Sequence, residues 1–557
     1  MGLATAVTME NKSETPDDEN TSDSAPEAPI STALELTTND EDSLLAKRSP
    51  SVWRGRLLHA AAVSIPLAIV LALAIDFGIH YFEAAEEHAV VIIGGGVAGL
   101  MTANALLESG MSPSDIVVLE MRDRIGGRLL NAPVDGFPDG HIEMGATFVG
   151  PTQAAILALS HNLSLSLFDT FLRFPGLSSP APSPQFEPAL AALISRPAVQ
   201  DALERFDQLA KSVPLAAPWD APNATALDAT SLEEWINSNS NSTAATDLGT
   251  ILREATGGAP SDVSLLYALF HWRSTNGLYT IGMRPGEIDR RYTEGSAALP
   301  SMLAARLTAA GVAVRLRCNV SKIAIDTPNA STGATLTLLQ GPSSLSHGGG
   351  GSAMWPSIIR ARRVVVATGS GDAGRISYRG LSAAKATQLS WWSYHGDLCA
   401  AVVYPNASWR AEPLLEVPAK CDDEQALRWG SGRLLDYSPP SGVPGILRLF
   451  GHPRGNTTAQ RRANLEATVC ECLGVCVPAL QYVEQFWDLN HDGGTANGRM
   501  LFRPGQFTSA AARAWRAPDG PLHWGGADTG EVWVGNMDAA VTSGVRCARE
   551  VVEALKA

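Results

Sequence analysis

The sequence predicts an α/β fold with a buried parallel sheet, and three observations along its 557 residues support this. First, Ala89–Ile93 is a continuous apolar run rich in β-branched residues, which is typical of a parallel strand buried on both faces. Second, the runs Ile116–Leu119 and Arg363–Thr368 have the same character. Third, the C-terminal segment Asp538–Leu555 carries apolar residues on one face, as expected of an amphipathic helix.

The composition limits the class of protein. Hydrophobic residues make up 45% of the chain, enough for a large core, and the length suits two or three domains or one large enzyme. With 42 Lys+Arg against 57 Asp+Glu, the net charge of −15 argues against binding nucleic acid. The seven cysteines are too few for a disulfide framework, and no Cys/His spacing matches a zinc site, so no metal is predicted.

The segment that precedes the predicted fold divides into a tail and an anchor. Residues 1–46 carry eleven acidic residues and one lysine, and so polar a segment buries too little apolar surface to fold, which predicts a disordered cytosolic tail over 1–56. The apolar run 57–75 is long enough to cross a bilayer core, so a transmembrane signal anchor is predicted over 57–82. Basic residues precede this run and acidic ones follow it, which places the N-terminus in the cytosol. The alternative is a buried core helix.

Glycosylation signals and cysteines agree with a lumenal or extracellular location for the rest of the chain. Seven Asn-x-Ser/Thr sequons follow the predicted anchor, at Asn162, Asn223, Asn241, Asn319, Asn329, Asn406 and Asn456. In that compartment some of Cys470, Cys472 and Cys476 can pair with Cys421 or with other cysteines. Buried free thiols are an equally good interpretation.

A glycine-rich turn follows the first predicted strand. The run Ala89–Ile93 leads directly into Gly94-Gly95-Gly96-Val97-Ala98-Gly99 and then into a predicted helix, Leu100–Ser109. The predicted strand Ile116–Leu119 comes next and ends at Glu120. This order of strand, glycine turn, helix, strand and acid is typical of a Rossmann-like dinucleotide-binding unit.

Each glycine of this turn has a physical role. Gly94 permits the tight turn, Gly96 lets the backbone approach a diphosphate, and Gly99 lets the helix pack closely on the strand. The N-terminus of the predicted helix, which follows Val97 and Ala98, offers N–H groups and a positive dipole to the phosphates. Glu120 lies 21 residues beyond Gly99, where a carboxylate accepts hydrogen bonds from a ribose diol.

Two further motifs carry a family resemblance. Glu120 opens the stretch E-M-R-D-R-I-G-G-R, which ends at Arg128, and Glu143–Gln153 reads E-M-G-A-T-F-V-G-P-T-Q. With the glycine turn, these stretches resemble the flavin-containing amine oxidase family, and the resemblance extends through most of residues 88–557. It implies FAD as cofactor, phosphate pairing by Arg128, and a flavin-contacting loop that includes Gly145, Ala146 and Thr147.

The resemblance also assigns residues in later segments. Val314–Val320 is predicted as a strand, and Val320 falls where the family contacts the adenine through its backbone. Asp528 falls on the acid that holds the ribityl hydroxyls. Asn536 and Met537 begin a helix whose N-terminus is expected to face the flavin pyrimidine.

The sequence departs from the family pattern at three places. Ala400 stands where many members have a lysine that holds a water against flavin N5. Thr495 stands where monoamine oxidases attach FAD through a cysteine, so non-covalent FAD is expected. The two aromatic residues that flank the amine in the family are replaced by Ala496, in a loose alignment, and by Asn536.

These features predict a discontinuous FAD-binding domain with an inserted α+β substrate domain. The FAD-binding domain is expected over 88–160, 290–375 and 485–557. The substrate domain is expected over 161–289 and 376–484.

The expected activity follows from the resemblance. It is an FAD-dependent oxidase that converts an amine to an imine, with hydride transfer to flavin N5 and release of H2O2. Its partners are then a small-molecule amine, molecular oxygen and, through the anchor, the lipid bilayer. No catalytic side chain is assigned, because the reaction needs a neutral, well-oriented amine rather than a recognisable acid–base motif. Two alternatives stay open, namely an FAD-dependent oxidase or desaturase of a non-amine substrate and a non-enzymatic FAD-binding protein.

Overall fold

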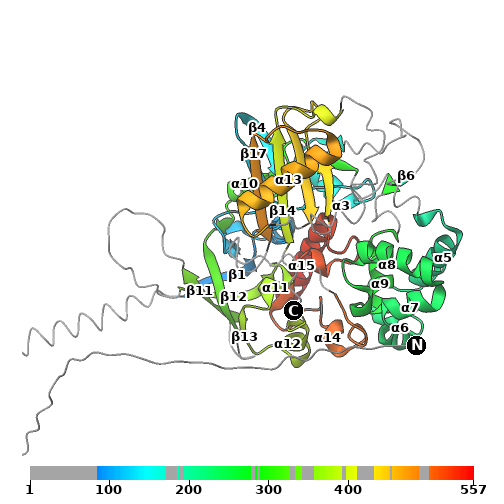
Figure 1. Ribbon diagram of the computed structural model, residues 1–557. Coiled ribbons are helices and arrows are strands. Elements are labelled where there is room, and N and C mark those ends of the chain that lie inside the picture. The colour runs from blue at the N-terminus through cyan, green and yellow to red at the C-terminus, as the bar shows by residue number, and fades with distance from the viewer. Residues whose placement is uncertain are drawn as a thin grey trace, which may run out of the picture. The chain divides into compact units, whose positions relative to one another are not determined.

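The structure is a computed structural model of the chain (Figure 1). It describes residues 85–170, 185–186, 193–277, 283–284, 289–326, 333–340, 357–391, 397–410, 432–451, 455–487 and 501–556. The predicted tail at 1–56 and the predicted anchor at 57–82 lie outside these residues. Within the described ranges, no helix combines the length and the apolar character needed to cross a bilayer.

A central sheet organises the described part of the chain. Its strand order is β13-β10-β11-β12-β1-β2-β9, with β18 beside β12. Strands β12, β1, β2, β9 and β18 pair in parallel, whereas β10, β11 and the first half of β12 form an antiparallel meander. The strands are β1 (Glu86–Ile93), β2 (Ile116–Leu119), β9 (Ala313–Arg315), β10 (Cys318–Ile325), β11 (Ala334–Gln340), β12 (Ser357–Val366), β13 (Ser377–Arg379) and β18 (Leu522–Trp524).

The first strand explains why the sequence shows a continuous apolar run. Val90–Ile93 are all buried, because β1 has strands on both sides and packed layers on both faces. The strand begins three residues before the predicted start, since Glu86 pairs with Arg315 and Glu87 with Arg360 at its outer end. Two of the acidic residues interpreted as the flank of the anchor therefore belong to the sheet.

The strand β12 belongs to two arrangements at once. Its first half, Ser357–Ala361, pairs antiparallel with β11, and its end, Val364–Val366, pairs in parallel with β18. The other edge of β12 pairs with β1 along most of its length. The strand predicted over Arg363–Thr368 is thus confirmed as a central strand, although it starts earlier.

Helices cover one face of the parallel strands. Val90 and Ile92 contribute to a cluster with residues of α2, α3, α10 and α15, while the other face packs against β10 and β11. A Cβ on Gly544 would lie 2.6 Å from the carbonyl oxygen of Ala98, so α15 and α2 approach closely. The helices are α2 (Val97–Glu108), α3 (Ala154–Asn162), α10 (Ala298–Ala309) and α15 (Met537–Lys556).

A group of helices forms a second cluster, which is rich in aromatic residues (Figure 1). Phe502, Phe507 and Trp515 from the C-terminal part of the chain pack into it. At the start of α7, Ser231 Oγ accepts from Glu234 N at 3.1 Å and Glu234 Oε2 accepts from Ser231 N at 2.7 Å, which is a capping box. The helices are α5 (Pro197–Lys211), α6 (Ala224–Ala229), α7 (Leu232–Asn239), α8 (Ser242–Thr256) and α9 (Leu265–Ser274).

A second sheet has the order β15-β16-β14-β17, and α13 covers one of its faces. Because side chains alternate along a strand, Ala400 faces α13, whereas Cys399 and Ala401 face Met144. The elements are β14 (Asp397–Tyr404), β15 (Gly432–Asp436), β16 (Gly445–Gly451), β17 (Gln481–Trp487) and α13 (Thr458–Leu473).

Short elements connect these layers. The hairpins and paired strands are β3 (Asn131–Val134) with β4 (Phe137–Glu143), β5 (Leu167–Asp169) with β8 (Arg290–Tyr292), and β6 (Gln185–Phe186) with β7 (Met283–Arg284). The short helices are α11 (Ser370–Ala373), α12 (Ala383–Leu389) and α14 (Ala510–Arg513).

Two local predictions need correction. The helix predicted over Leu100–Ser109 begins at Val97, inside the glycine motif, and ends at Glu108. The strand predicted over Val314–Val320 is two strands, because Arg317 has φ +59° and donates its N–H to the carbonyl of Arg122. The turn at this residue sends the chain from β9 to β10.

One disulfide lies among the cysteines for which pairing is expected. Cys470 and Cys476 form a disulfide with each other. Cys318, Cys399 and Cys547 are free thiols, whereas Cys421 lies outside the described residues. The division into FAD-binding and substrate domains stays a prediction.

Candidate active site

The β1–α2 turn has the geometry of an anion site. Gly94 has φ +111° and donates its N–H to the carbonyl of Leu119 at 2.8 Å. A Cβ on Gly99 would lie 2.0 Å from the carbonyl oxygen of Gly94, so only glycine fits. Gly96 is the N-cap of α2 and supplies no side-chain cap, which leaves the N–H groups at Val97 and Ala98 in the first turn available to a ligand.

Glu120 is fixed beside this turn. Its side chain is buried, its Oε2 accepts from Gly95 N at 2.7 Å, and its Oε1 accepts from Arg122 N at 3.0 Å. The carbonyl of Glu120 accepts from Cys318 N at 2.8 Å, which brings the start of β10 to the end of β2. Val320 lies two residues further along β10 and is buried. The carboxylate predicted for a ribose and the residue predicted for an adenine thus lie at one end of the site.

The second glycine pair packs against the first turn. Gly126 donates its N–H to the carbonyl of Gly95 at 2.9 Å, and both Gly126 and Gly127 have positive φ, of +104° and +56°. A Cβ on Gly127 would lie 3.6 Å from Gly96 Cα. The two backbones are therefore close together at these glycines, and neither residue fills the space between them with a side chain. This gap between two backbones suits a diphosphate.

Arg128 and Asp528 meet at the other end of the site. Arg128 Nη2 lies 3.4 Å from Asp528 Oδ2, which also accepts from Ser370 Oγ at 3.3 Å. Asp528 is buried and Arg128 is partly exposed. Close by, Gly535 donates its N–H to the carbonyl of Ala527 at 3.0 Å, just before α15 begins.

Buried polar atoms without partners lie at this end. Thr368 Oγ1, Trp515 Nε1 and Trp524 Nε1 have no hydrogen-bond partner among the described residues, and their residues line one small cavity together with Ser370 and Thr529. Buried polar groups are normally satisfied, so these atoms fit an additional polar molecule there.

Asn536 and Met537 lie at the N-terminus of α15. Asn536 is half-buried and its backbone carbonyl accepts from Ala540 N at 3.2 Å, within the first turn. Met537 is buried in the cluster that also contains Val97 and Ala98. The N-termini of α2 and α15 are therefore both held at this site.

The Met144–Thr147 segment runs beside Arg128. Met144 N donates to Leu130 O at 2.8 Å, and Ala146 N donates to Arg128 O at 3.1 Å. A Cβ on Gly145 would lie 2.0 Å from that same oxygen, so a side chain does not fit there. Thr147 is buried, and its Oγ1 donates to the carbonyl of Gly145 at 3.1 Å.

Sequence reasoning missed one residue at this segment, Arg448 on β16. Its guanidinium donates to Gly145 O at 3.0 Å and to Thr147 Oγ1 at 3.1 Å, and the side chain is only 2% exposed. The available signal was the arginine in the otherwise apolar run Gly445–Gly451.

The three departures from the family pattern have different outcomes. Ala400 packs on the α13 side of β14 rather than toward Met144. Thr495 and Ala496 lie outside the described residues. Asn536 is the departure that the structure places at the site itself.

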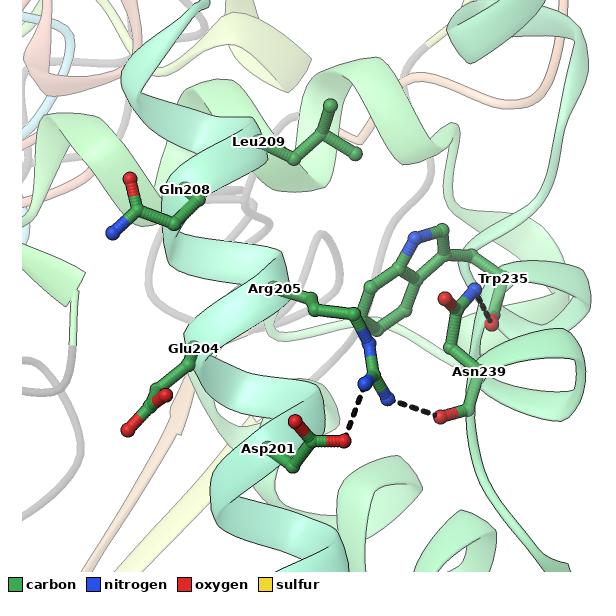
Figure 2. A pocket seen from close by; sticks show the side chains of 7 residues that line it. All are labelled: Asp201, Glu204, Arg205, Gln208, Leu209, Trp235 and Asn239. Carbon is green, nitrogen blue, oxygen red and sulfur yellow. Dashed lines mark hydrogen bonds and ion pairs between the residues drawn. The ribbon is translucent and has the colours of Figure 1, made fainter.

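A separate surface hollow of about 630 Å³ lies on α5 and α7 (Figure 2). Arg205 crosses it, pairing with Asp201 and donating to the carbonyl of Asn239 at 2.7 Å. Trp235 forms part of the lining. The ion pair in this hollow is exposed, and the residues that line the hollow come from α5, from α7 and from the ends of these helices. We therefore do not assign the hollow to the active site.

All fourteen predicted cofactor residues lie within the described part of the chain, at connected turns and helix starts. The arrangement fits FAD, since a glycine cradle, a buried carboxylate at one end and an Arg–Asp pair at the other match a diphosphate flanked by two polyols. Fold and site together define a dinucleotide-binding oxidoreductase of the α/β class.

Comparison with known proteins specifies this class further. The family model described as flavin containing amine oxidoreductase matches residues 97–552. The chain belongs to this flavin-containing amine oxidase family, whose members use FAD and act on amines.

Individual relatives and solved structures are similar to the chain over most of its length. A Mycobacterium tuberculosis protein named as a flavin-containing monoamine oxidase, AofH, is 30% identical over 487 residues, covering 84% of this chain and 97% of that protein. Amine oxidase A of Canis lupus familiaris is 26% identical over 493 residues, covering 84% and 85%. Cyclohexylamine oxidase from Brevibacterium oxydans has the same fold, with a TM-score of 0.65, 22% identity and coverage of 85% and 100%. Putrescine oxidase bound to putrescine has a TM-score of 0.65 and 21% identity, covering 84% and 99%.

Proposed function

We propose that this protein is an oxidase that converts an amine to an imine. FAD held by the residues of this site would supply the redox chemistry, which is two-electron oxidation of the amine by hydride transfer to flavin N5 and reoxidation by O2 with release of H2O2. The observation that carries the proposal is one continuous site, from Glu120 through the glycine turns to Arg128 and Asp528, in a chain that the family matches over most of its length.

Different residues of the site are proposed to hold different parts of the cofactor. Gly96 and the N-terminus of α2 receive the diphosphate, and Glu120 receives the ribose. Asp528 receives the ribityl hydroxyls, and Arg128 balances the charge of that carboxylate. The N-terminus of α15 directs its positive dipole to the flavin end. We propose that the attachment is non-covalent, because Thr495 has no thiol.

One observation favours a polar or non-amine substrate as a second candidate. Asn536 stands at the N-terminus of α15, where the family has an aromatic residue. An amide can hydrogen-bond a polar group but cannot form half of an aromatic cage. This candidate keeps FAD and changes the bond that is oxidised.

The test uses the full chain purified in detergent. A yellow protein whose absorbance bleaches anaerobically with one member of a panel of primary, secondary and polyamines, and which produces peroxide in air, supports amine oxidation. Bleaching only by non-amine compounds supports the second candidate. A colourless protein that stays colourless with added FAD rejects both. Acid precipitation that leaves flavin in the supernatant supports non-covalent attachment.

We also propose that residues 57–82 anchor the protein in a membrane, with residues 1–56 in the cytosol and the oxidase unit in a lumenal or extracellular space. Two observations support a lumenal or extracellular location of the oxidase unit. The Cys470–Cys476 disulfide suits an oxidising compartment. Most described sequon asparagines are exposed, namely Asn162, Asn223, Asn241, Asn406 and Asn456.

Protease protection in sealed vesicles tests this topology. We expect the oxidase unit to be protected from protease and to shift in mobility on glycosidase treatment. Digestion of the oxidase unit without detergent contradicts the topology.

A further inference from the structure

A buried group of charged and aromatic side chains lies behind the Met144–Thr147 segment. We call it the Arg448 cluster, and its members are Glu143, Thr147, Arg291, Tyr437 and Arg448. Each is at most 3% exposed. Burying two guanidinium groups costs free energy unless hydrogen bonds compensate for the lost hydration. The hydrogen bonds of this cluster therefore indicate its role.

Arg448 binds the segment through both terminal nitrogens. Its Nη1 donates to Gly145 O at 3.0 Å and to Thr147 Oγ1 at 3.1 Å, and its Nη2 lies 3.4 Å from Met144 O. Three acceptors of one four-residue segment thus face a single planar guanidinium. A lysine would keep the charge but lacks this planar fork.

Tyr437 holds the guanidinium in place. Its hydroxyl accepts from Arg448 Nη1 at 3.0 Å and lies 3.5 Å from Thr147 Oγ1. Two cations lie near the ring, with the Arg291 guanidinium carbon 4.4 Å and that of Arg448 5.0 Å from its centroid. Burial raises the pKa of Tyr437, so its phenol stays protonated and neutral beside them.

Arg291 connects the Tyr437 ring to Glu143. Its Nε donates to Glu143 Oε2 at 2.7 Å, and Glu143 Oε1 accepts from Ser296 N at 2.9 Å. Glu143 immediately precedes Met144. The cluster therefore fixes both the start of the segment and its end.

The held segment is connected to the Arg128–Asp528 pair. The carbonyl of Arg128 accepts from Ala146 N at 3.1 Å, while the Arg128 side chain reaches Asp528 at 3.4 Å. Any displacement of the segment away from β16 pulls on the backbone of Arg128. A continuous set of contacts thus runs from Arg448, on the second sheet, to the carboxylate at the cofactor end.

We propose that Arg448 is a positioning residue for the FAD site. It holds the Met144–Thr147 segment in place and thereby keeps Arg128 close to Asp528. It also places a permanent positive charge behind that segment. The proposal rests on the proposed function, because it requires FAD to lie in this site. The hydrogen-bonding fork sets how well FAD binds, and the charge favours the added electrons of the reduced cofactor.

Three variants of the full chain separate the fork from the charge. In Arg448→Lys, which keeps only the charge, FAD is expected to bind about tenfold more weakly, as loss of charge-assisted hydrogen bonds implies, with a midpoint potential near that of the wild type. In Arg448→Met, which lacks both, the midpoint potential also becomes more negative. In Tyr437→Phe, which removes the hydroxyl that accepts from Arg448 Nη1 but keeps the ring and Arg448, FAD binding weakens and the visible band of the flavin shifts.

The measurements are the FAD dissociation constant by fluorescence, the visible spectrum, and the midpoint potential against reference dyes. Arg461→Lys is the matched control, because Arg461 is also a buried arginine with hydrogen-bonded terminal nitrogens, but it lies on α13 and its partner is Glu484. It is expected to leave all three quantities unchanged.

Two outcomes are distinct. If the wild type binds FAD, and Arg448→Lys and Tyr437→Phe bind it with the wild-type constant and spectrum, the positioning role is wrong and the proposed function stands. If Arg448→Met or Arg448→Lys does not fold, Tyr437→Phe decides alone. A wild type that binds no FAD overturns the proposed function and, with it, this inference.

Discussion

The guanidinium of Arg128 lies 3.4 Å from the carboxylate of Asp528, although 400 residues separate the two in the chain. Asp528 is buried, so its charge depends on this arginine and on the hydroxyl of Ser370. The contact joins the unit that opens the fold to the strand and helix that close it.

Neutralising this carboxylate is expected to weaken FAD binding. Asp528→Asn keeps the size of the side chain but removes the ion pair, and we expect the FAD dissociation constant to rise about tenfold or more. Fluorescence titration of the full chain measures this. Asp262→Asn, at an exposed position of a short turn, is the control and is expected to have no effect. Equal affinity in Asp528→Asn would remove Asp528 from the cofactor site.

Two glycine-to-alanine changes are expected to act in opposite directions. In Gly99→Ala the new Cβ would lie 2.0 Å from the carbonyl oxygen of Gly94, so the β1–α2 turn has to distort, and we expect loss of FAD and a lower melting temperature. Gly249 lies within α8, and a Cβ there meets no atom within 4 Å. Gly249→Ala is therefore expected to stabilise the helix by about 1 kcal/mol. Thermal unfolding of both variants, followed by flavin fluorescence, checks the contrast.

Lys385 makes stability depend on pH. It is fully buried, with Nζ donating to Trp515 O at 2.8 Å and lying 4.2 Å from the centre of the Trp524 ring, and burial lowers its pKa to about 7. The unfolded chain, with an ordinary lysine pKa near 10.5, binds more protons between about pH 7 and pH 10.5. The contribution of Lys385 to stability therefore rises with pH across this range.

The matched test is Lys385→Met, which keeps the apolar stem and cannot titrate. Its melting temperature is expected to exceed that of the wild type most at pH 6, and the difference is expected to shrink toward pH 10. Lys556→Met, at an exposed position, serves as control. A difference that is constant with pH would mean that Lys385 stays charged in the fold.

Asn536 is expected to govern substrate choice. Asn536→Leu removes the amide but keeps a similar size, so kcat/KM for substrates with a second polar group is expected to fall about tenfold relative to apolar ones. The FAD spectrum is expected to change little, because the helix start is formed by backbone groups. Equal losses for polar and apolar substrates would argue that Asn536 supports the helix rather than the substrate.

The sequence was sufficient to predict the β1–α2 turn and the acid that lies beside it. Glycines at Gly94, Gly96 and Gly99 and the acid at Glu120 act through local backbone geometry, which spacing along the chain reveals. The early start of α2 escaped prediction, because periodicity marks the apolar face of a helix and not its first turn. The positions of Arg128 and Asp528 were suggested by family resemblance, since nothing local links residues so far apart.

The Arg448 cluster shows what local patterns leave out. Arg448 and Arg291 stand in short strands, and an arginine there is usually exposed. Their burial depends on Glu143 and Tyr437, which come from other parts of the chain. The division of Val314–Val320 into two strands was missed for a related reason, because a left-handed arginine at 317 has no compositional signal.

The shared strand β12 has a consequence for biosynthesis. Its end, Val364–Val366, is completed on one edge by β18, which is translated long after β1, β2 and β12. Nascent chains that stop before Leu522 have the glycine turn and Glu120, but Val364–Val366 has no partner on that edge. Flavin loading is therefore expected to wait until β18 has been translated, and a cell short of riboflavin should accumulate empty protein that contains β18 rather than shorter fragments.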